Sequence, residues 1–332
     1  MKRRDFIAGL GGVAAWPVVA WAQPTERVRR IGMLTFSAEN DPLNQSFIAL
    51  FREGLAKLGW VEGRNLRIDL RFGATDADRT RAGAAELVSL GPDVIVTYGV
   101  APTMAVQRQT QLIPIVFAAV GDPLATGVVK NLARPEGNTT GVTNLYVSIA
   151  GKWLELLKEA APRVERVGFV YSPDLGSTAE GLSPYSSSLE EAARALGVQA
   201  ISIPFRNAVE LVRAIDAFAA RPNGGLIVLP PSPTAVDRRT INQLAIHHQL
   251  PTIFQDRYYA AEGGLIAYGG DVIEIYRTAS TYADGILRGA KVSDLPVQLP
   301  TKIPLVINLK TAKAIGLVIP ESFLLRADEV IE

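Results

Sequence analysis

Residues Ile113 to Val142 read IPIVFAAVGDPLATGVVKNLARPEGNTTGV, and this stretch decides the predicted fold. It opens with an almost unbroken apolar run, Ile113 to Val120, typical of a strand buried on both faces of a parallel sheet. Gly121-Asp122-Pro123 then stops the strand and predicts the start of a helix, with Asp122 as its cap. Because open α/β sheets bind ligands at the carboxyl ends of their strands, we expect a binding site at this edge.

The composition excludes several classes of function. The chain has 332 residues, of which 48% are hydrophobic, and this length predicts about two domains. Its 34 Lys+Arg and 33 Asp+Glu leave a net charge of +1, which does not indicate a nucleic-acid or anionic-membrane partner. Cysteine is absent, so disulfides, thiolate metal sites, cysteine nucleophiles and a lipid-modified N-terminal cysteine are excluded.

The first 22 residues have the pattern of a signal peptide. Lys2-Arg3-Arg4 is basic, residues 6–19 are weakly hydrophobic, and Ala20-Trp21-Ala22 is a small-x-small cleavage site. The apolar run is shorter than the roughly 20 residues of a membrane span. The arginine pair resembles the twin-arginine motif, and both twin-arginine export and general secretion stay open. We expect a periplasmic protein with no stable membrane insertion after cleavage.

The mature chain alternates strands and helices. Residues 31–36 form an expected strand that ends at Ser37, and Asp41-Pro42 then opens a helix that ends at Gly59. The same alternation predicts a parallel sheet covered by helices. Its further strands are expected at residues 66–72, 94–98 and 113–120, and its further helices at 79–90 and from about residue 102.

The second half of the chain repeats the first. RVRRIGML at 27–34 is echoed by RVERVGFV at 163–170, and QLIPIVF at 111–117 by QLPTIF at 249–254. Two shorter matches lie between them, in the same order. β-α units also look alike because they share turn chemistry, but four ordered matches favour two similar lobes.

We place the first lobe at residues 28–143 plus 271–308 and the second at 144–270 plus 309–332. Segments ending near Tyr146 and Tyr268 cross between the lobes and are the expected hinge. More than one crossing predicts a hinge with restricted motion.

Five motifs in order carry a family resemblance: PIVF at 114–117, GDP at 121–123, LARP with GNTTG within 132–141, GGLIAYG at 263–269 and LVINLKTAK at 305–313. With them the chain resembles the periplasmic substrate-binding proteins of ABC transporters, in particular the family that includes tryptophan/tyrosine-type binding proteins. The resemblance implies a type I periplasmic binding fold, with two doubly wound parallel-sheet lobes, a multi-strand hinge and the ligand between the lobes. Glu136 departs from the family pattern, as does Pro231-Ser232, where an aspartate is frequent.

Candidate ligand residues follow the expected strand ends of both lobes. The helix that begins after Gly99 and Val100 suits a carboxylate. Asp122 or Asp256 would hold an ammonium group, and tyrosines would cover an apolar or aromatic side chain. The pattern predicts an amino acid, preferably an aromatic one. The candidates are Ser37, Tyr98, Gly99, Val100, Asp122, Tyr171, Ser172, Ser232, Asp256 and Tyr258.

Each candidate also has a plainer interpretation. Asp122 is equally suited to capping alone, and the tyrosines to packing at strand ends. Ser172 and Ser232 lie beside prolines and are typical turn residues. Asp256 and Arg257 suit a surface ion pair.

No metal, cofactor or catalytic site is predicted. His247 and His248 are adjacent near a helix end, and no hydrolase elbow, P-loop or zinc-protease motif occurs. We therefore expect a non-catalytic, monomeric protein that captures an amino acid or a related aromatic or carboxylate compound. The resemblance implies delivery to the permease of an ABC importer. The alternatives are a sensor module of the same fold that signals to a membrane receptor, and an exported α/β enzyme.

Overall fold

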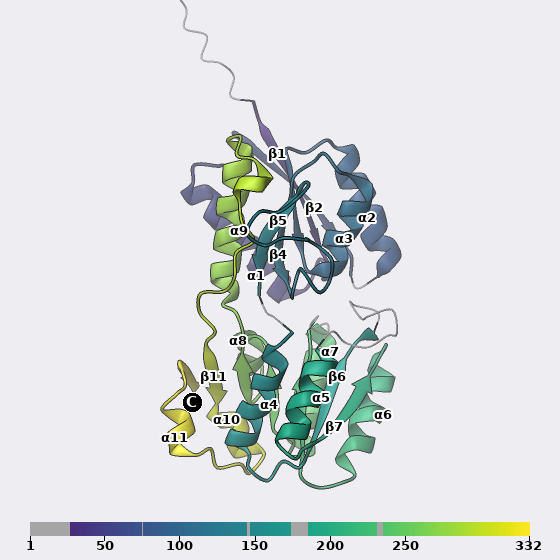
Figure 1. Ribbon diagram of the computed structural model, residues 1–332, viewed down its shortest axis with the longest axis vertical. Coiled ribbons are helices and arrows are strands. Elements are labelled where there is room, and N and C mark those ends of the chain that lie inside the picture. Colours follow the sequence, from purple (N-terminus) through teal and green to yellow (C-terminus); the bar gives the residue numbers. More distant parts are fainter. Residues whose placement is uncertain (1–26, 75, 145–146, 174–184, 231–234) are drawn as a thin grey trace, which may run out of the picture.

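The computed structural model describes residues 27–332 except 75, 145–146, 174–184 and 231–234. The predicted signal peptide lies outside the described residues. The chain forms two lobes, one above the other, each with a central sheet and helices on both sides (Figure 1). The predicted α/β class with two lobes is confirmed.

The first lobe is built on five parallel strands in the order β2-β1-β3-β4-β5. The order reverses between β1 and β3, which makes this the topological switch point where open α/β sheets bind ligands. The strands are β1 (Arg29–Thr35), β2 (Leu66–Phe72), β3 (Val94–Tyr98), β4 (Ile115–Val120) and β5 (Thr139–Thr143).

Helices cover both faces of this sheet, α1 (Pro42–Lys57) and α9 (Val272–Leu287) on one and α2 (Ala77–Ser89) and α3 (Val100–Gln109) on the other. Helix α1 starts as predicted, because the Asp41 carboxylate accepts the amide of Leu43 at 3.0 Å. Helix α9 returns from the second half of the chain to pack against α1. The indole of Trp60 donates a hydrogen bond to Asp284 of α9 at 2.7 Å.

The helix predicted after β4 is absent from the described chain, and this expectation was wrong. Asp122 and Gly127 have φ of 38° and 73°, which residues within an α-helix do not adopt, so the segment makes turns. The Asp122 carboxylate still accepts a backbone amide, that of Ala125, at 3.0 Å. Val128 then packs on Phe117, so a loop covers this edge of the sheet.

The second lobe repeats the strand order in a larger sheet, β12-β11-β10-β9-β8-β6-β7. Its part β7-β6-β8-β9 matches β2-β1-β3-β4 strand for strand, which confirms the repeat read from the sequence. Strand β11 runs antiparallel to β10, a departure from the predicted parallel sheet. The strands are β6 (Arg166–Tyr171), β7 (Gln199–Pro204), β8 (Gly224–Val228), β9 (Thr252–Phe254), β10 (Ile266–Tyr268), β11 (Leu305–Asn308) and β12 (Glu329–Ile331).

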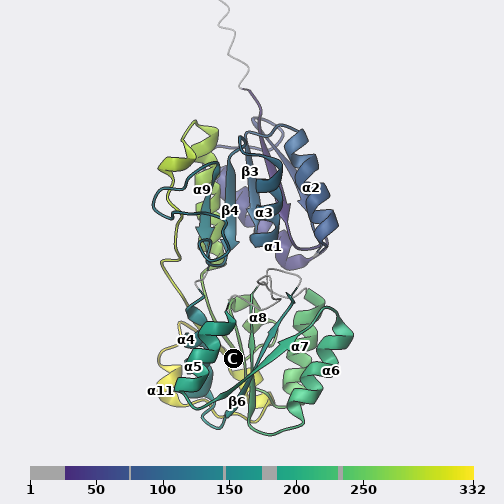
Figure 2. The same ribbon diagram turned by 45° about the vertical axis from the view of Figure 1, so that its right-hand side comes forward.

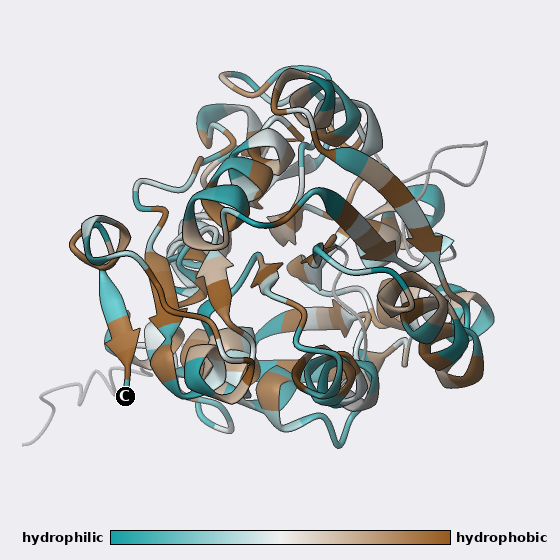
Figure 3. Cartoon of the chain, turned by 90° about the horizontal axis from the view of Figure 1, so that it is seen from below, coloured by the Kyte–Doolittle hydropathy of each residue, from teal (hydrophilic) through white to brown (hydrophobic). Residues whose placement is uncertain are grey.

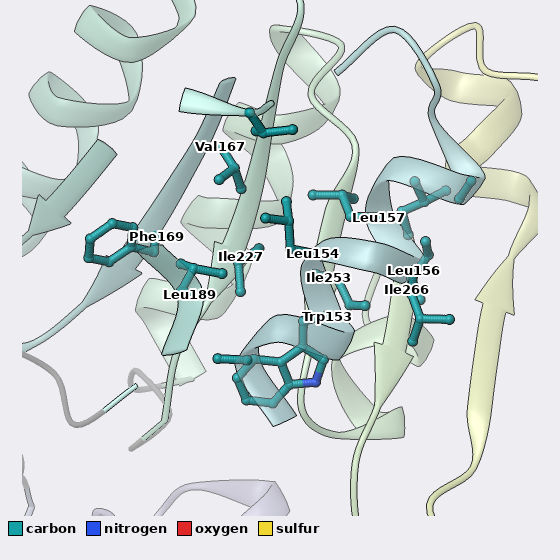
Figure 4. Close-up of a cluster of buried hydrophobic side chains, with 14 of the residues drawn as sticks. Trp153, Leu154, Leu156, Leu157, Val167, Phe169, Leu189, Ile227, Ile253 and Ile266 are labelled. Atoms are coloured by element: carbon teal, nitrogen blue, oxygen red, sulfur yellow. The ribbon is translucent and has the colours of Figure 1, made fainter. Parts of the chain in front are cut away.

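Hydrophobic residues concentrate on these strands and on the helix faces turned toward them (Figure 3). Trp153 is fully buried in the core of the second lobe (Figure 4). Its indole donates a hydrogen bond to the main-chain oxygen of Tyr268 at 2.6 Å, which ties this core to the end of β10. The helices of this lobe are α4 (Ile149–Ala160), α5 (Ser186–Ala195), α6 (Ala208–Ala219), α7 (Ala235–His247), α8 (Arg257–Ala261), α10 (Leu309–Ala314) and α11 (Glu321–Leu324).

Three segments of the chain cross between the lobes: one after β5, one between β10 and α9, and one that leads to β11. The last runs down the outside of the molecule after a short 3-10 helix, Val292–Asp294 (Figures 1 and 2). All three meet at Gly270. A Cβ atom there would lie 2.8 Å from the main-chain oxygen of Asn144 and 3.3 Å from Cβ of Pro300, so a side chain at this position would push the crossings apart.

The end of the predicted first-lobe segment, residues 271–308, requires a correction. Residues 305–308 form β11, which pairs with β10 and β12 in the sheet of the second lobe. The side-chain amide of Asn308 also donates to the main-chain oxygen of Ala260 at 2.8 Å. The chain therefore crosses back before Leu305. The sequence placed this crossing too late because an apolar strand pattern does not say which sheet the strand joins.

Candidate functional site

Predicted site residues lie at the carboxyl ends of strands in both sheets. In the first lobe, Ser37 follows β1 and Tyr98 ends β3, the two strands at the switch point. In the second lobe, Ser172 follows β6. Ser232 was predicted to follow β8 and lies outside the described residues.

A small cavity between the lobes joins three of the predicted residues, Ser37, Tyr98 and Asp256. Its volume is about 20 Å³, close to the space of one water molecule. The lobes are therefore in direct contact here. Its walls are Phe36, Ser37, Asp41, Leu43, Asn44, Phe47 and Tyr98 of the first lobe and Arg238, Asp256 and Tyr259 of the second.

Aromatic rings fill the first-lobe side of this junction. The ring centroid of Tyr98 lies 5.0 Å from that of Phe36 and 5.6 Å from that of Phe47. Tyr258 of the second lobe reaches across and packs edge-on against Phe47 at 5.5 Å. The predicted ligand residue Tyr258 thus contributes to the contact between the two lobes.

Arg238 places a buried positive charge at the junction. Its side chain is 5% exposed, and its Nε donates to Glu262 of the same lobe at 3.2 Å. Its Nη2 lies 3.8 Å from Oδ1 of Asp41 in the first lobe. The guanidinium also lies over the ring of Tyr259, 5.4 Å from the centroid. A charge buried in this way needs such partners, and one of them belongs to the opposite lobe.

Asp256 is a buried carboxyl group at the start of α8. Its side chain accepts the amide of Tyr258 at 3.1 Å. Burial raises its pKa to about 7, although that hydrogen bond and the charges of Arg257 and Arg238 act in the opposite direction. The pKa of this group therefore lies near neutral pH, above that of an exposed aspartate.

A second junction lies beside the first crossing, where Tyr185 of the second lobe touches the turn after β4. A Cβ atom on Gly121 would overlap the hydroxyl oxygen of Tyr185, so glycine permits this close approach. Burial raises the pKa of Tyr185 above its usual range, and the charge of Asp122 adds to that effect. Asp122 is the next residue along the chain after Gly121. The side-chain oxygen of Asn144 lies near the same point, 3.8 Å from the Cβ position of Gly121.

The remaining predicted residues take other positions. Tyr171 packs in the core of the second lobe and accepts a hydrogen bond from Ser202 at 3.2 Å, so it does not line the cavity. Gly99 has φ of 87°, and Val100 begins α3. Tyr268 ends β10, where its carbonyl holds Trp153, and Tyr146 lies outside the described residues.

Sequence reasoning missed Arg238, Asn144 and Tyr185. Arg238 precedes Arg239 in the same helix, and only the structure distinguishes the buried arginine from the exposed one. Asn144 lies just after the GNTTG motif at 137–141, in a segment interpreted from the sequence only as a connection between the lobes. For Tyr185 the signal is Gly121, since a glycine directly after a buried strand marks a close approach.

Within the described part of the chain, no three His, Cys, Asp or Glu residues gather in a way that would hold a metal ion. His248 instead contacts Asp216 at 2.7 Å. No helix among the described residues has the length and apolar character of a membrane span.

The model of the family described as ABC transporter substrate binding protein matches residues 38–331. The chain belongs to this family. The family predicted from the five motifs is confirmed, and it is a family of binding proteins that act outside the cytoplasm, not of enzymes. Neither the sensor module nor the exported enzyme is favoured.

Known relatives are similar to this substrate-binding protein over most of its length. A tyrosine-binding protein of Clostridioides difficile (strain R20291) is 28% identical over 269 residues, which are 80% of this chain and 75% of the relative. A conserved domain protein of Vibrio cholerae shares 26% identity and a TM-score of 0.81, over 92% of this chain and 100% of that one.

Two further solved structures are similar over nearly the whole chain. An ABC domain of Streptococcus pneumoniae in complex with L-tryptophan is 25% identical, with a TM-score of 0.80 over 91% of this chain and 99% of that one. A substrate binding protein of Clostridium difficile in its ligand-free, open structure is also 25% identical, yet has a TM-score of 0.66 over 92% and 99%. At similar identity and coverage, the structure of this protein as a whole is more similar to the complex than to the open structure.

Proposed function

We propose that this substrate-binding protein captures an amino acid with an aromatic side chain, or a related carboxylate compound, and delivers it to the permease of an ABC importer. The observation that carries the proposal is a junction where the switch point of the first sheet, an aromatic cluster, the segment after β9 and buried carboxyl groups meet. The names of the relatives, a tyrosine-binding protein and an L-tryptophan complex, support the same class of solute.

Each part of an amino acid has a proposed contact. The amide groups at the start of α3, next to Gly99 and Val100, receive the carboxylate, because a helix N-terminus carries partial positive charge. Asp122 or Asp256 faces the ammonium group. Tyr98 and the rings around it flank the aromatic side chain. Ser37 and Ser172 supply hydroxyl groups at the strand ends.

Capture works by closure of two lobes about the three crossings. A ligand that touches both lobes binds the closed arrangement better than the open one, so it shifts the population toward closure. The lobes comprise residues 28–143 with 271–304, and 144–270 with 305–332. The permease then recognises the closed, loaded form.

The protein acts as a monomer in the periplasm after cleavage behind Ala22, by either twin-arginine export or general secretion. The basic residues, the apolar stretch and the cleavage pattern at residues 1–22 support this route.

A thermal-shift screen of the mature protein against the twenty amino acids and a panel of sugars and carboxylates tests the solute class. A ligand that binds only the folded state raises the melting temperature. We expect the largest shifts with L-tyrosine and L-tryptophan. A shift with sugars and none with amino acids would contradict the proposal.

A further inference from the structure

Asn144 lies in the first crossing and carries a buried acceptor atom. Its Oδ1 is buried and has no hydrogen-bond partner within the described residues. Buried side-chain oxygens in proteins are nearly always paired, so an unpaired one marks a place where a donor is expected. The crossing brings this atom to the boundary between the lobes.

Two more oxygen groups surround the same point. The Cβ position of Gly121 lies 3.8 Å from Asn144 Oδ1 and overlaps the hydroxyl oxygen of Tyr185, so these two oxygens flank the bare glycine. Asp122 is the next residue along the chain after Gly121, and its carboxylate accepts the amide of Ala125 at 3.0 Å. An amide oxygen and a hydroxyl oxygen thus flank Gly121, and a carboxylate residue directly follows it in the chain.

This set suits a positively charged donor. A carboxylate and an amide oxygen only accept hydrogen bonds, and a hydroxyl oxygen has lone pairs for the same purpose. An ammonium group has three donors and no acceptor, so it matches three oxygens of this kind. Asp122 adds the opposite charge, which makes such hydrogen bonds shorter and stronger.

We infer that Asp122, Asn144 and Tyr185 bind the ammonium group of the solute and that Asp256 does not. The inference rests on the proposed binding of an amino acid and names the subsite within it. The three residues come from the first lobe, the crossing and the second lobe. An ammonium group held by all three therefore bridges the parts that move on closure.

Asp256 is unsuited to this task because positive charges already neighbour it. Arg238 lines the same cavity, and Arg257 is the next residue along the chain. The cavity beside it measures about 20 Å³, room for about one water molecule and not for an ammonium group with its carbon atom.

The test compares an amino acid with its deaminated analogue. Isothermal titration of the mature protein with L-tryptophan and with 3-indolepropionate measures the preference for the ammonium group, and L-tyrosine and its deaminated analogue repeat the comparison. The variants are Asp122→Asn, Asn144→Leu, Asn144→Asp and, as the matched carboxyl control, Asp256→Asn. Asparagine tolerates the left-handed backbone at position 122 and keeps an oxygen for the amide of Ala125.

We expect Asp122→Asn and Asn144→Leu to weaken amino-acid binding about tenfold or more, the effect of losing a charged or buried hydrogen bond. Binding of the deaminated analogue changes much less. Asn144→Asp keeps the acceptor and retains the preference for the amino acid, as does Asp256→Asn. Thermal unfolding of each variant shows that the fold is intact.

The outcomes separate this inference from the proposed function. If the unaltered protein binds neither amino acid, the proposed solute class is wrong and this subsite fails with it. If it binds them and only Asp256→Asn removes the preference, the solute class stands and the ammonium group lies at Asp256, which overturns the inference. An unchanged preference in both Asp122→Asn and Asn144→Leu overturns it as well.

Discussion

Arg238 of α7 and Asp41 at the start of α1 face each other across the lobe junction, with Nη2 3.8 Å from Oδ1. Their side chains are only 5% and 9% exposed, so solvent and salt screen their attraction weakly. Glu262 holds the same guanidinium from within its own lobe. Separation of the lobes breaks the contact with Asp41 and leaves the contact with Glu262, so the pair with Asp41 stabilises the closed arrangement in particular.

Replacement of Asp41 by asparagine removes the charge that Arg238 meets and keeps an oxygen for the amide of Leu43. We expect ligand binding to weaken by about 1 kcal/mol, because Arg238 retains Glu262 in both arrangements and only a partly shared ion pair is lost. Isothermal titration measures this change. Arg239→Met, on the exposed side of the same helix, is the control. Equal affinities for the two variants would contradict a cross-lobe pair.

Stability depends on pH through Asp256. Its native pKa of about 7 lies above the value of about 3.9 for an unfolded chain, so the native state binds the extra proton between these values. The free energy of unfolding therefore falls as pH rises from about 4 to 7, by at most about 1.4 kcal/mol per pH unit from this group. Urea unfolding between pH 5 and 8 measures the slope, and Asp256→Asn is expected to flatten it. The same slope in both proteins would show that Asp256 is not buried as described.

Gly121→Ala introduces a methyl group that overlaps the Tyr185 hydroxyl when the lobes are closed. We expect weaker ligand binding, since overpacking costs about 1–3 kcal/mol, with little change in the stability of either lobe. In a Tyr185→Phe background the nearest remaining ring atom is 3.6 Å away, so the alanine causes no further loss there.

A double-mutant cycle by isothermal titration measures this coupling. Gly285→Ala, where the added methyl group meets only ordinary contact at 3.7 Å, controls for an extra side chain. Additive effects of the changes at positions 121 and 185 would show that the two residues do not touch in the closed protein.

Trp153→Phe removes the hydrogen bond to Tyr268 and leaves a small cavity in the core of the second lobe. We expect a loss of about 1–3 kcal/mol in the free energy of unfolding. Urea unfolding followed by circular dichroism measures it. Leu325→Ala, at a position 82% exposed, should change stability by less than about 0.5 kcal/mol. A similar effect of both substitutions would be inconsistent with the described core.

The sequence predicted the order of strands well because each buried strand with its turn is a local signal. The echo of residues 27–34 at 163–170 predicted β1 and β6, which occupy equivalent places in the two sheets. The turn after β4 was mistaken for a helix because Asp122 and Pro123 suit a helix start, whereas the left-handed backbone at Asp122 depends on the loop packing that follows.

The candidate site was predicted less completely, because contacts between distant segments leave no local pattern. Ser37, Tyr98 and Asp256 lie at or just after the ends of strands, as predicted, and they line one cavity. Tyr171 also ends a strand, yet its ring packs in the core of the second lobe. The sequence pattern of its helix does not distinguish Arg238 from its neighbours. Arg238 belongs to the site because it contacts Asp41, which lies 197 positions earlier in the chain (238 − 41).

The most direct test of the central claim is a calorimetric titration of the mature, ligand-stripped protein with L-tyrosine and L-tryptophan. The account predicts saturable binding of one solute molecule per chain, at micromolar or tighter affinity, to at least one of the two amino acids. No measurable heat with either amino acid at millimolar concentration, from a protein that is folded by circular dichroism, would contradict it.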